Sequence, residues 1–232
     1  MTGPPATGYL AGLLIVVMAV RTYYRDVVVV GASTGGVEAL RSLVSGLPPD
    51  LAAVVAVVLH LPAGGTSALP SILSRAGPLP ALTAEDDMRL RPGRVYVAPP
   101  GRHLLVVGDH LHLSDQPTGS AHRPAVDALF RSAARALGPR VIGVVPSGVL
   151  SDGTAGLVEI AARGGTTMVQ DPADARYRGM PDSALRRLTA DHVLPAGGMG
   201  AVLADLTREP VEAPPPAPGG PGRTRQRDDV RR

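Results

Sequence analysis

A serine framed by glycines follows a strongly apolar run early in the chain. The run is Val27–Val30, and the residues after it read Gly31-Ala-Ser33-Thr-Gly35. This spacing matches G-x-S-x-G, in which a sharp strand-to-helix turn presents the serine oxygen beside backbone N–H donors. Ser33 is therefore a candidate nucleophile, and the N–H groups near Thr34 and Gly35 are candidate donors to an oxyanion.

A dinucleotide-binding loop is a competing interpretation of this turn. Such a loop needs glycine where Ser33 stands and an acidic residue after the second strand. The second strand is predicted over Val54–Leu59, and His60 follows it. A histidine there suits a general base better than a ribose contact, so the pattern favours nucleophilic chemistry. A plain phosphate-binding or packing turn is the alternative for the motif taken alone.

A second glycine-rich turn carries an aspartate. The strand predicted over Arg140–Val145 runs into this turn, which contains Asp152. A serine nucleophile needs a base to take its proton and an acid to orient that base. Because ligands of open α/β sheets bind at the carboxyl ends of strands, Ser33, His60 and Asp152 are expected to converge there. The plainer alternatives are that Asp152 caps the helix after it and that His60 is a structural residue at a strand end.

Composition excludes several other kinds of chemistry. The chain has no cysteine, which removes thiolate metal sites and a cysteine nucleophile. All 23 basic residues are arginine, the net charge is only +3, and aromatic residues make up 3%, so we expect no nucleic-acid partner. His103, His110 and His112 lie on or beside a predicted hairpin, where alternating polar positions explain them better than a metal site does. We expect neither a metal nor a cofactor.

Strands and helices alternate along most of the chain. Buried strands at Val27–Val30, Val54–Leu59 and Arg140–Val145 are each followed by a helical pattern. This order predicts an α/β fold with a doubly wound, mostly parallel sheet. One antiparallel hairpin is predicted from His103–Val107 and Leu111–Leu113, joined at Gly108-Asp109.

One domain is predicted over residues 26–206, with an extension at each end. Residues 1–25 contain an uncharged run of twelve residues, Tyr9–Val20, whereas a membrane-spanning helix needs about 20. We expect no stable membrane insertion and a cytoplasmic protein, with weak membrane association as the alternative. Residues 207–232 are rich in proline, glycine and arginine, which predicts disorder.

Several separated motifs stand in a fixed order along the chain. They are Gly31–Gly36, His60 with Pro62, His122–Asp127, Ser147–Gly153 and Gly179–Pro181. Together they resemble the catalytic domain of CheB-type chemotaxis protein-glutamate methylesterases. The resemblance covers about Val27 to Leu206, and it implies a three-layer α/β fold. It also implies hydrolysis of glutamyl methyl esters on chemoreceptors, often with deamidation of receptor glutamines.

The resemblance also implies roles for individual residues. The triad serine, histidine and aspartate correspond to Ser33, His60 and Asp152, with Thr34 beside the nucleophile. Candidates for the substrate groove are Arg123, Val149 and Met180, and a surface ion pair is the alternative for Arg123. A methylated chemoreceptor or a similar signalling protein is the expected partner.

The chain departs from the family pattern in two places. The family turn reads Thr-Gly-Met-Gly-Asn-Asp-Gly, whereas this one reads Ser-Gly-Val149-Leu150-Ser-Asp152-Gly. If the replaced glycine has a positive φ, Leu150 strains the turn that positions Asp152. The residues before Val27 are also too few for the usual receiver domain, so control by phosphorylation, if there is any, is expected to come through a separate protein such as a phosphorelay regulator.

Two other functions are open at this point. The first is a serine esterase that acts on a different small or protein ester. The second is a non-catalytic binding or scaffold module, in which the altered turn misplaces Asp152.

Overall fold

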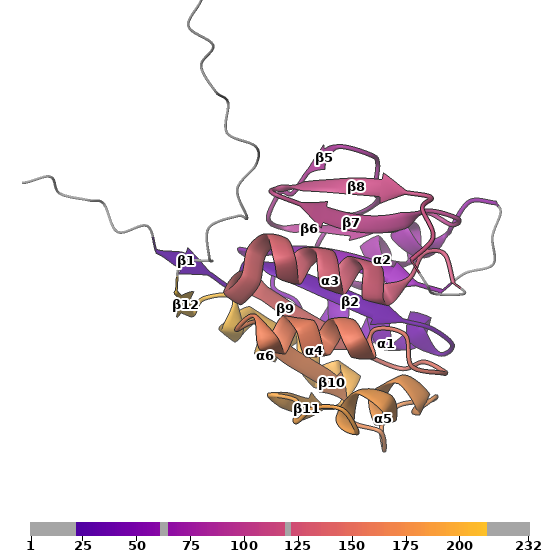
Figure 1. Ribbon diagram of the computed structural model, residues 1–232, viewed down its shortest axis with the longest axis vertical. Helices are drawn as coiled ribbons and strands as arrows, with labels where there is room; N and C mark the ends of the chain where they lie inside the picture. Colours follow the sequence, from indigo (N-terminus) through magenta and orange to yellow (C-terminus); the bar gives the residue numbers. More distant parts are fainter. Residues whose placement is uncertain (1–21, 61–64, 119–121, 213–232) are drawn as a thin grey trace, which may run out of the picture.

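The computed structural model describes residues 22–60, 65–118 and 122–212. Within these ranges a seven-stranded sheet forms the middle of the molecule (Figure 1). Every neighbouring pair of its strands is parallel, which confirms the predicted sheet. In spatial order the strands are β11 (His192–Leu194), β10 (Thr166–Gln170), β9 (Val141–Val145), β2 (Val27–Ala32), β3 (Val54–Leu59), β6 (Arg94–Val97) and β4 (Ala81–Thr83).

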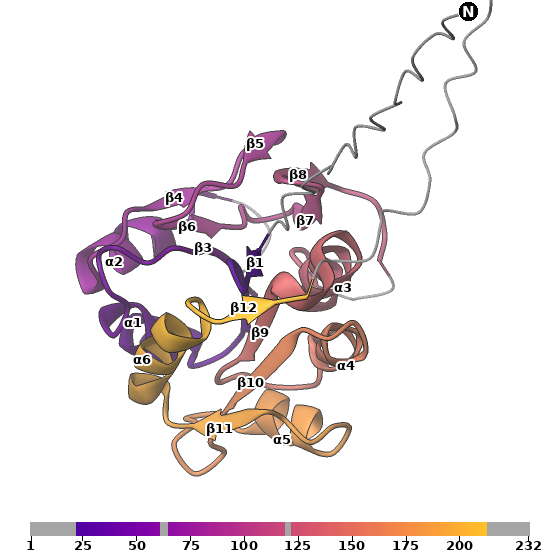
Figure 2. The same ribbon diagram turned by 90° about the vertical axis from the view of Figure 1, so that its left-hand side faces the viewer.

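Helices cover both faces of this sheet and complete three layers (Figure 2). Successive residues of β2 point to opposite faces, so Val28 and Val30 join one core and Val29 joins the other. The helices on the first face are α1 (Gly36–Ser45), α2 (Leu69–Ala76) and α6 (Ala196–Leu206). Those on the second face are α3 (Val126–Leu137), α4 (Thr154–Ala162) and α5 (Gly179–Leu185).

A small antiparallel sheet packs beside α3 on the second face. Its strands lie in the order β5 (Met88–Arg89), β8 (His110–Ser114) and β7 (His103–Val107). The predicted hairpin is confirmed in β7 and β8. The strand β5 was not predicted, because a strand of two residues is too short to show an alternating pattern of apolar and polar residues. A short 3-10 turn, η1 (Gly138–Arg140), leads from α3 into β9.

The fold extends beyond the predicted limits of residues 26–206. The strand β1 (Tyr23–Tyr24) pairs antiparallel with β12 (Pro210–Val211). Nearby, Arg25 forms a 2.7 Å ion pair with Glu209. The predicted disorder is therefore wrong for residues 207–212. The prediction relied on the lack of apolar residues to bury, whereas the backbone of this segment pairs with β1. The remaining predicted extensions, Tyr9–Val20 included, lie outside the described residues.

Within the described ranges, no helix has the length and apolar character required to cross a bilayer.

The order of the strands creates a switch point between β2 and β9. The chain leaves β2 toward β3 on one side, and it leaves β9 toward β10 on the other. Connections that diverge in this way open a crevice at the carboxyl ends of the two strands, where open α/β sheets bind ligands. Ser33 directly follows β2, and the turn that contains Asp152 follows β9. The fold therefore sets both residues at this crevice.

The crossing of α3 over β2 depends on Gly31. A Cβ atom on Gly31 would overlap the side chain of Val126, which begins α3. We expect Gly31→Ala to lower the free energy of unfolding by about 1–3 kcal/mol through overpacking. Urea denaturation measures this change.

The matched control for that substitution is Gly197→Ala in the first turn of α6. A Cβ atom there meets no heavy atom within 4 Å, so we expect stability to be unchanged or raised by up to about 1 kcal/mol. Equal destabilisation by the two substitutions would contradict the packing argument.

Candidate active site

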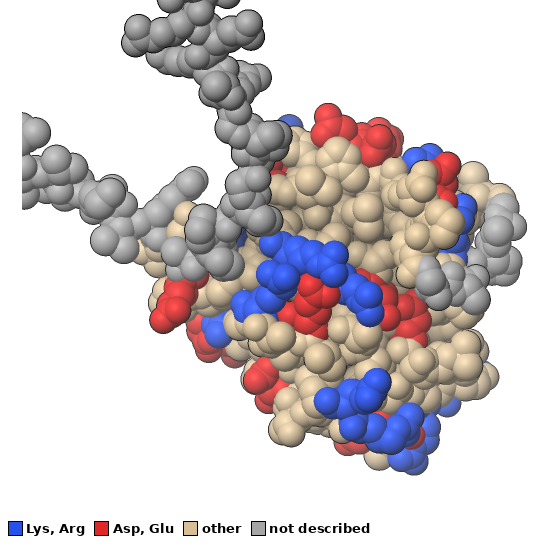
Figure 3. All heavy atoms as spheres, in the orientation of Figure 1, with Lys and Arg blue, Asp and Glu red and all other residues tan. Residues whose placement is uncertain are grey.

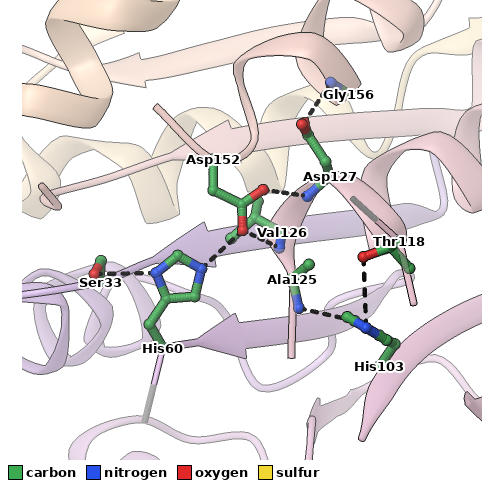
Figure 4. Close-up of polar contacts among 9 residues, drawn as sticks. All are labelled: Ser33, His60, His103, Thr118, Ala125, Val126, Asp127, Asp152 and Gly156. Atoms are coloured by element: carbon green, nitrogen blue, oxygen red, sulfur yellow. Dashed lines mark hydrogen bonds and ion pairs between the residues drawn. The ribbon is translucent and has the colours of Figure 1, made fainter. Parts of the chain in front are cut away.

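Ser33, His60 and Asp152 lie in one line of hydrogen bonds at the carboxyl edge of the sheet (Figure 4). Ser33 follows β2, and His60 follows the neighbouring strand β3. The Nδ1 atom of His60 is 3.2 Å from Ser33 Oγ, and its Nε2 atom is 2.8 Å from Asp152 Oδ2. The side chains of His60 and Asp152 are only 7% and 10% exposed. The fold thus brings the three predicted residues together.

The two ring nitrogens of His60 have distinct partners. An ionised carboxylate only accepts hydrogen bonds, so Nε2 is the protonated ring nitrogen and its N–H donates a hydrogen bond to Asp152. The lone pair of Nδ1 then faces the Ser33 hydroxyl group as an acceptor. Chymotrypsin-type triads use the two nitrogens the other way round. In either arrangement, the imidazole can draw the proton from the serine.

The carboxylate of Asp152 sits on the first turn of α3. Its Oδ2 atom accepts a hydrogen bond from the N–H of Val126 at 2.8 Å, and Oδ1 accepts one from the N–H of Asp127 at 3.0 Å. A helix N-terminus offers unpaired N–H donors and a favourable dipole for a negative charge. Asp152 does not cap the helix that follows it, since α4 has no side-chain cap. Its backbone partners belong to a different helix.

This environment determines the charge of Asp152. Burial alone would raise the pKa of Asp152, but hydrogen bonds from His60 and from the N–H groups of Asp127 and Val126 outweigh it and hold the pKa below its usual value. The neighbouring Asp127 differs, because burial raises its pKa and the hydrogen bonds from the N–H groups of Gly156 and Gly153 do not outweigh that effect. Asp152 is therefore the carboxylate that stays ionised beside His60.

The turn after Ser33 leaves two backbone donors available. Gly35 adopts a positive φ of 74° and precedes α1, a conformation that favours glycine. The N–H of Ser33 donates to Ser147 O at 3.2 Å, and the N–H of Gly36 donates to Ser33 O at 2.8 Å. The N–H groups of Thr34 and Gly35 have no acceptor within the described ranges. These two groups can bind a developing negative charge beside Ser33.

The three predicted groove residues occupy different environments. Val149 is 37% exposed in the turn before Asp152. Met180 is fully buried, and a Cβ atom on Gly148 would overlap its sulfur. The Met180 side chain therefore packs against the turn before Asp152 and does not itself face an open groove, and a role of its loop in shaping the groove stays a prediction. Arg123 is exposed and makes no hydrogen bond or ion pair with Ser33, His60 or Asp152.

A second histidine covers the ring of His60. The imidazoles of His60 and His122 stack with centroids 4.2 Å apart and planes inclined by 9°. His122 also lines a cleft of about 630 Å³ with Leu150 and Asp152. The sequence alone assigns no individual role to His122. In the sequence, His122 is marked only by its place in the motif His122–Asp127. No local pattern around it indicates that it contacts His60.

The hairpin histidines do not gather at one point. His103 is 1% exposed, and its Nδ1 atom accepts a hydrogen bond from the N–H of Ala125 at 3.1 Å, just before α3. Burial, helped by the charge of Arg123, lowers the pKa of His103, which keeps it a neutral acceptor. The interpretation of His103 as an alternating surface position is therefore wrong. His110 and His112 lie near Asp109 and Asp86, at 2.9 and 3.5 Å.

Leu150 has the backbone conformation expected of the glycine that it replaces. Its φ is +66°, and its side chain is 66% exposed. A left-handed conformation costs a non-glycine residue about 1–2 kcal/mol. The strain predicted for this turn is thus present, and the exposed side chain gains little from burial to offset it.

Replacing Leu150 with glycine should relieve this strain. We expect Leu150→Gly to raise the free energy of unfolding by about 0.5–1 kcal/mol, after the greater flexibility of glycine in the unfolded chain is subtracted. Leu150→Ala is the control, because alanine keeps the strained φ, and it should give no gain. Thermal or urea denaturation compares the two variants, and equal stability would argue against backbone strain.

The depressed pKa of Asp152 predicts a specific dependence of stability on pH. Its ionised form stabilises the fold at pH values above the unfolded pKa of about 3.9, and this contribution is lost as the pH falls below that value. At pH 7 we expect Asp152→Asn to cost about 2 kcal/mol, as for hydrogen bonds to a charged group. The difference in unfolding free energy between Asp152→Asn and the unchanged protein should become smaller when urea denaturation is repeated toward pH 3.

Asp205→Asn is the control for this series, because Asp205 lies exposed on α6. Its stability should follow that of the unchanged protein at every pH. Asp127 contributes with the opposite sign, because burial and, to a smaller extent, the charge of Asp152 raise its pKa. Asp152→Asn removes that second cause, so the effect of Asp127 is smaller in this variant than in the other proteins. A deficit for Asp152→Asn that is constant from pH 7 to pH 3 would refute the assignment of the charge.

Comparison with known proteins gives relatives along most of the chain. A "Protein-glutamate methylesterase/protein-glutamine glutaminase 2" of Anaeromyxobacter dehalogenans is 42% identical over 183 residues, which cover 79% of this chain and 54% of that protein. A "Protein-glutamate methylesterase/protein-glutamine glutaminase 1" of Burkholderia pseudomallei is 40% identical over 176 residues, covering 74% and 48%. The chain spans about half the length of these curated relatives.

A solved structure and a family model agree with these relatives. The crystal structure of the Thermotoga maritima CheB methylesterase catalytic domain matches with a TM-score of 0.75 and 34% identity, covering 78% of this chain and 98% of that one. The family model described as CheB methylesterase matches residues 28–203, which include Ser33, His60 and Asp152. The chain therefore belongs to the CheB methylesterase family.

Proposed function

We propose that this chain is a protein-glutamate methylesterase, which hydrolyses the γ-methyl esters of glutamyl residues in a signalling protein such as a chemoreceptor. The observation that carries the proposal is the hydrogen-bonded line from Ser33 through His60 to Asp152 in a member of the CheB methylesterase family. The names of the relatives supply the substrate class. The geometry supports the type of reaction.

Ser33 is the proposed nucleophile. Its Oγ atom attacks the γ-carbonyl carbon of the ester while its proton moves to Nδ1 of His60, 3.2 Å away. The imidazolium that forms is stabilised by the Asp152 carboxylate on Nε2. The low pKa of Asp152 supports this role, because the carboxylate is charged throughout the neutral range.

The N–H groups of Thr34 and Gly35 are the proposed oxyanion donors. Both lie in the turn after Ser33 and lack another acceptor within the described ranges. They can therefore stabilise the negative charge that develops on the carbonyl oxygen. As the tetrahedral intermediate collapses, His60 returns the proton to the methoxy oxygen and methanol leaves. Water, deprotonated by His60, then cleaves the acyl-enzyme and restores Ser33.

The same residues can support deamidation of glutaminyl side chains. The relatives carry protein-glutamine glutaminase in their names as well as methylesterase. The steps are the same, with ammonia leaving in place of methanol. An amide nitrogen is a poorer leaving group, so this reaction depends more strongly on proton donation by His60.

The test is release of methanol from a peptide that contains a glutamyl γ-methyl ester. We expect Ser33→Ala and His60→Ala each to lower kcat by roughly 10⁴-fold or more, as for other residues that act as one catalytic unit. In parallel, a fluorophosphonate probe followed by mass spectrometry should label Ser33 in the unchanged protein and not in His60→Ala.

The outcomes separate the proposal from its alternatives. A scaffold module would show no labelling of Ser33 in folded protein, which would overturn the proposal. A serine esterase of another specificity would be labelled and would hydrolyse a generic activated ester, yet would release no methanol from the peptide. Methanol release that is unaffected by Ser33→Ala would place the nucleophile elsewhere.

A further inference from the structure

A short arginine-rich segment lies directly against the Ser33 turn. A Cβ atom on Gly35 would meet Tyr177 Cδ2 at 2.9 Å and Arg176 Cβ at 3.2 Å. The hydroxyl of Ser147 holds the segment in place, since it accepts a hydrogen bond from the N–H of Tyr177 at 3.0 Å. Arg176 and Tyr177 therefore lie against the turn that carries Ser33.

This segment and the helix α5 that follows it carry an excess of positive charge. Residues 176–187 contain four arginines and one acidic residue, Asp182. The side chains of Arg176 and Arg178 are each 67% exposed, and Arg186 and Arg187, which follow the end of α5, are both exposed. Figure 3 shows basic side chains gathered over α5, at the lower right of the view. We call Arg176, Arg178, Arg186 and Arg187 the α5 arginines.

The existing ion pairs leave these charges available to a ligand. Arg178 pairs with Asp182 at 2.7 Å, and Arg176 lies 3.7 Å from Glu38. Exposed pairs of this kind contribute about 0–1 kcal/mol, so carboxylates of a bound partner can replace them at little cost. The charge left over after pairing is positive.

Exposed apolar side chains lie in this segment and in the turn that packs against it. Tyr177, Val149 and Leu150 are 39%, 37% and 66% exposed. The two segments that carry them touch, because a Cβ atom on Gly179 would lie 3.2 Å from Val149 Cα. An apolar centre with a charged rim is the usual composition of a surface that binds a protein partner.

We propose that the α5 arginines, with Tyr177, Val149 and Leu150, bind an acidic polypeptide segment of the substrate protein. Carboxylates on either side of the reactive glutamyl residue pair with the arginines, while the apolar side chains contact the segment and its γ-carbonyl group reaches Ser33. The inference rests on the proposed function and adds the substrate class, a glutamyl residue flanked by further carboxylates. A polypeptide fits better than a nucleic acid, because Tyr177 alone among these seven residues offers an aromatic face.

The experiment measures binding in the Ser33→Ala background, where turnover cannot intervene. A fluorescent peptide with a central glutamyl methyl ester and flanking glutamates is compared with the same peptide carrying flanking glutamines. At low salt we expect the acidic peptide to bind about tenfold more tightly, and we expect about 0.5 M NaCl to remove most of that preference by screening. A single-stranded oligonucleotide of the same charge is expected to bind more weakly.

Two double variants identify the surface. Arg176→Gln with Arg178→Gln should reduce affinity for the acidic peptide about five- to tenfold and leave the neutral peptide unaffected. Arg163→Gln with Arg208→Gln removes the same charge at the ends of α4 and α6, so it should behave as the unchanged protein. With Ser33 restored, the control variant that carries Arg163→Gln and Arg208→Gln should hydrolyse an activated phenyl ester at the rate of the unchanged protein.

The outcomes keep the two proposals distinct. Equal binding of the acidic and neutral peptides, equal loss in both double variants, or tighter binding of the oligonucleotide would each overturn the docking surface. If the preference holds but the unchanged protein releases no methanol from the acidic peptide, the surface stands and the proposed methylesterase function fails. Methanol release without any charge preference would support the methylesterase function and overturn the docking surface.

Discussion

Burial of one carboxylate on the N-terminus of α3 is the constraint on which the rest of the site depends. A buried charge is tolerated only when it is paired and hydrogen-bonded. The carboxylate of Asp152 meets this condition with donors from Val126, Asp127 and His60. These bonds fix the start of α3, the turn after β9 and the imidazole ring relative to one another. The line to Ser33 follows, because β3 and β2 are adjacent strands.

The same constraint explains where the domain needs small residues. For its N–H groups to reach the Asp152 carboxylate, the first turn of α3 must lie over the carboxyl half of β2 and against α4. Val126 then fills the space above Gly31 and Gly153, and Phe130 fills the space above Gly156. A side chain at any of these glycines would push α3 away and remove donors from Asp152. Three glycines that are far apart in the sequence are therefore needed for the same reason, which is the close packing of α3 that brings its N–H groups to Asp152.

Local patterns predicted the elements but not the contacts between them. The valine runs of β2 and β3, and the glycine-framed Ser33, are local signals, so the sheet and the strand-to-helix turn could be predicted. The cap on Asp152 joins residues about 25 positions apart, and no periodicity encodes such a distance. The buried Met180, the stacked His122 and the pairing of β1 with β12 escaped prediction for the same reason. Each depends on how separate elements pack.

The strained Leu150 shows how the turn before Asp152 tolerates an unfavourable residue. The turn is held on both sides of Leu150: the N–H of Gly148 donates to Tyr177 O and its carbonyl accepts from Met180 N, both at 2.9 Å, and the Asp152 carboxylate is bonded to α3 beyond it. Strain persists where surrounding contacts over-determine the backbone. The backbone strain therefore stays confined to Leu150, whose side chain is exposed, and Asp152 keeps its hydrogen bond to His60.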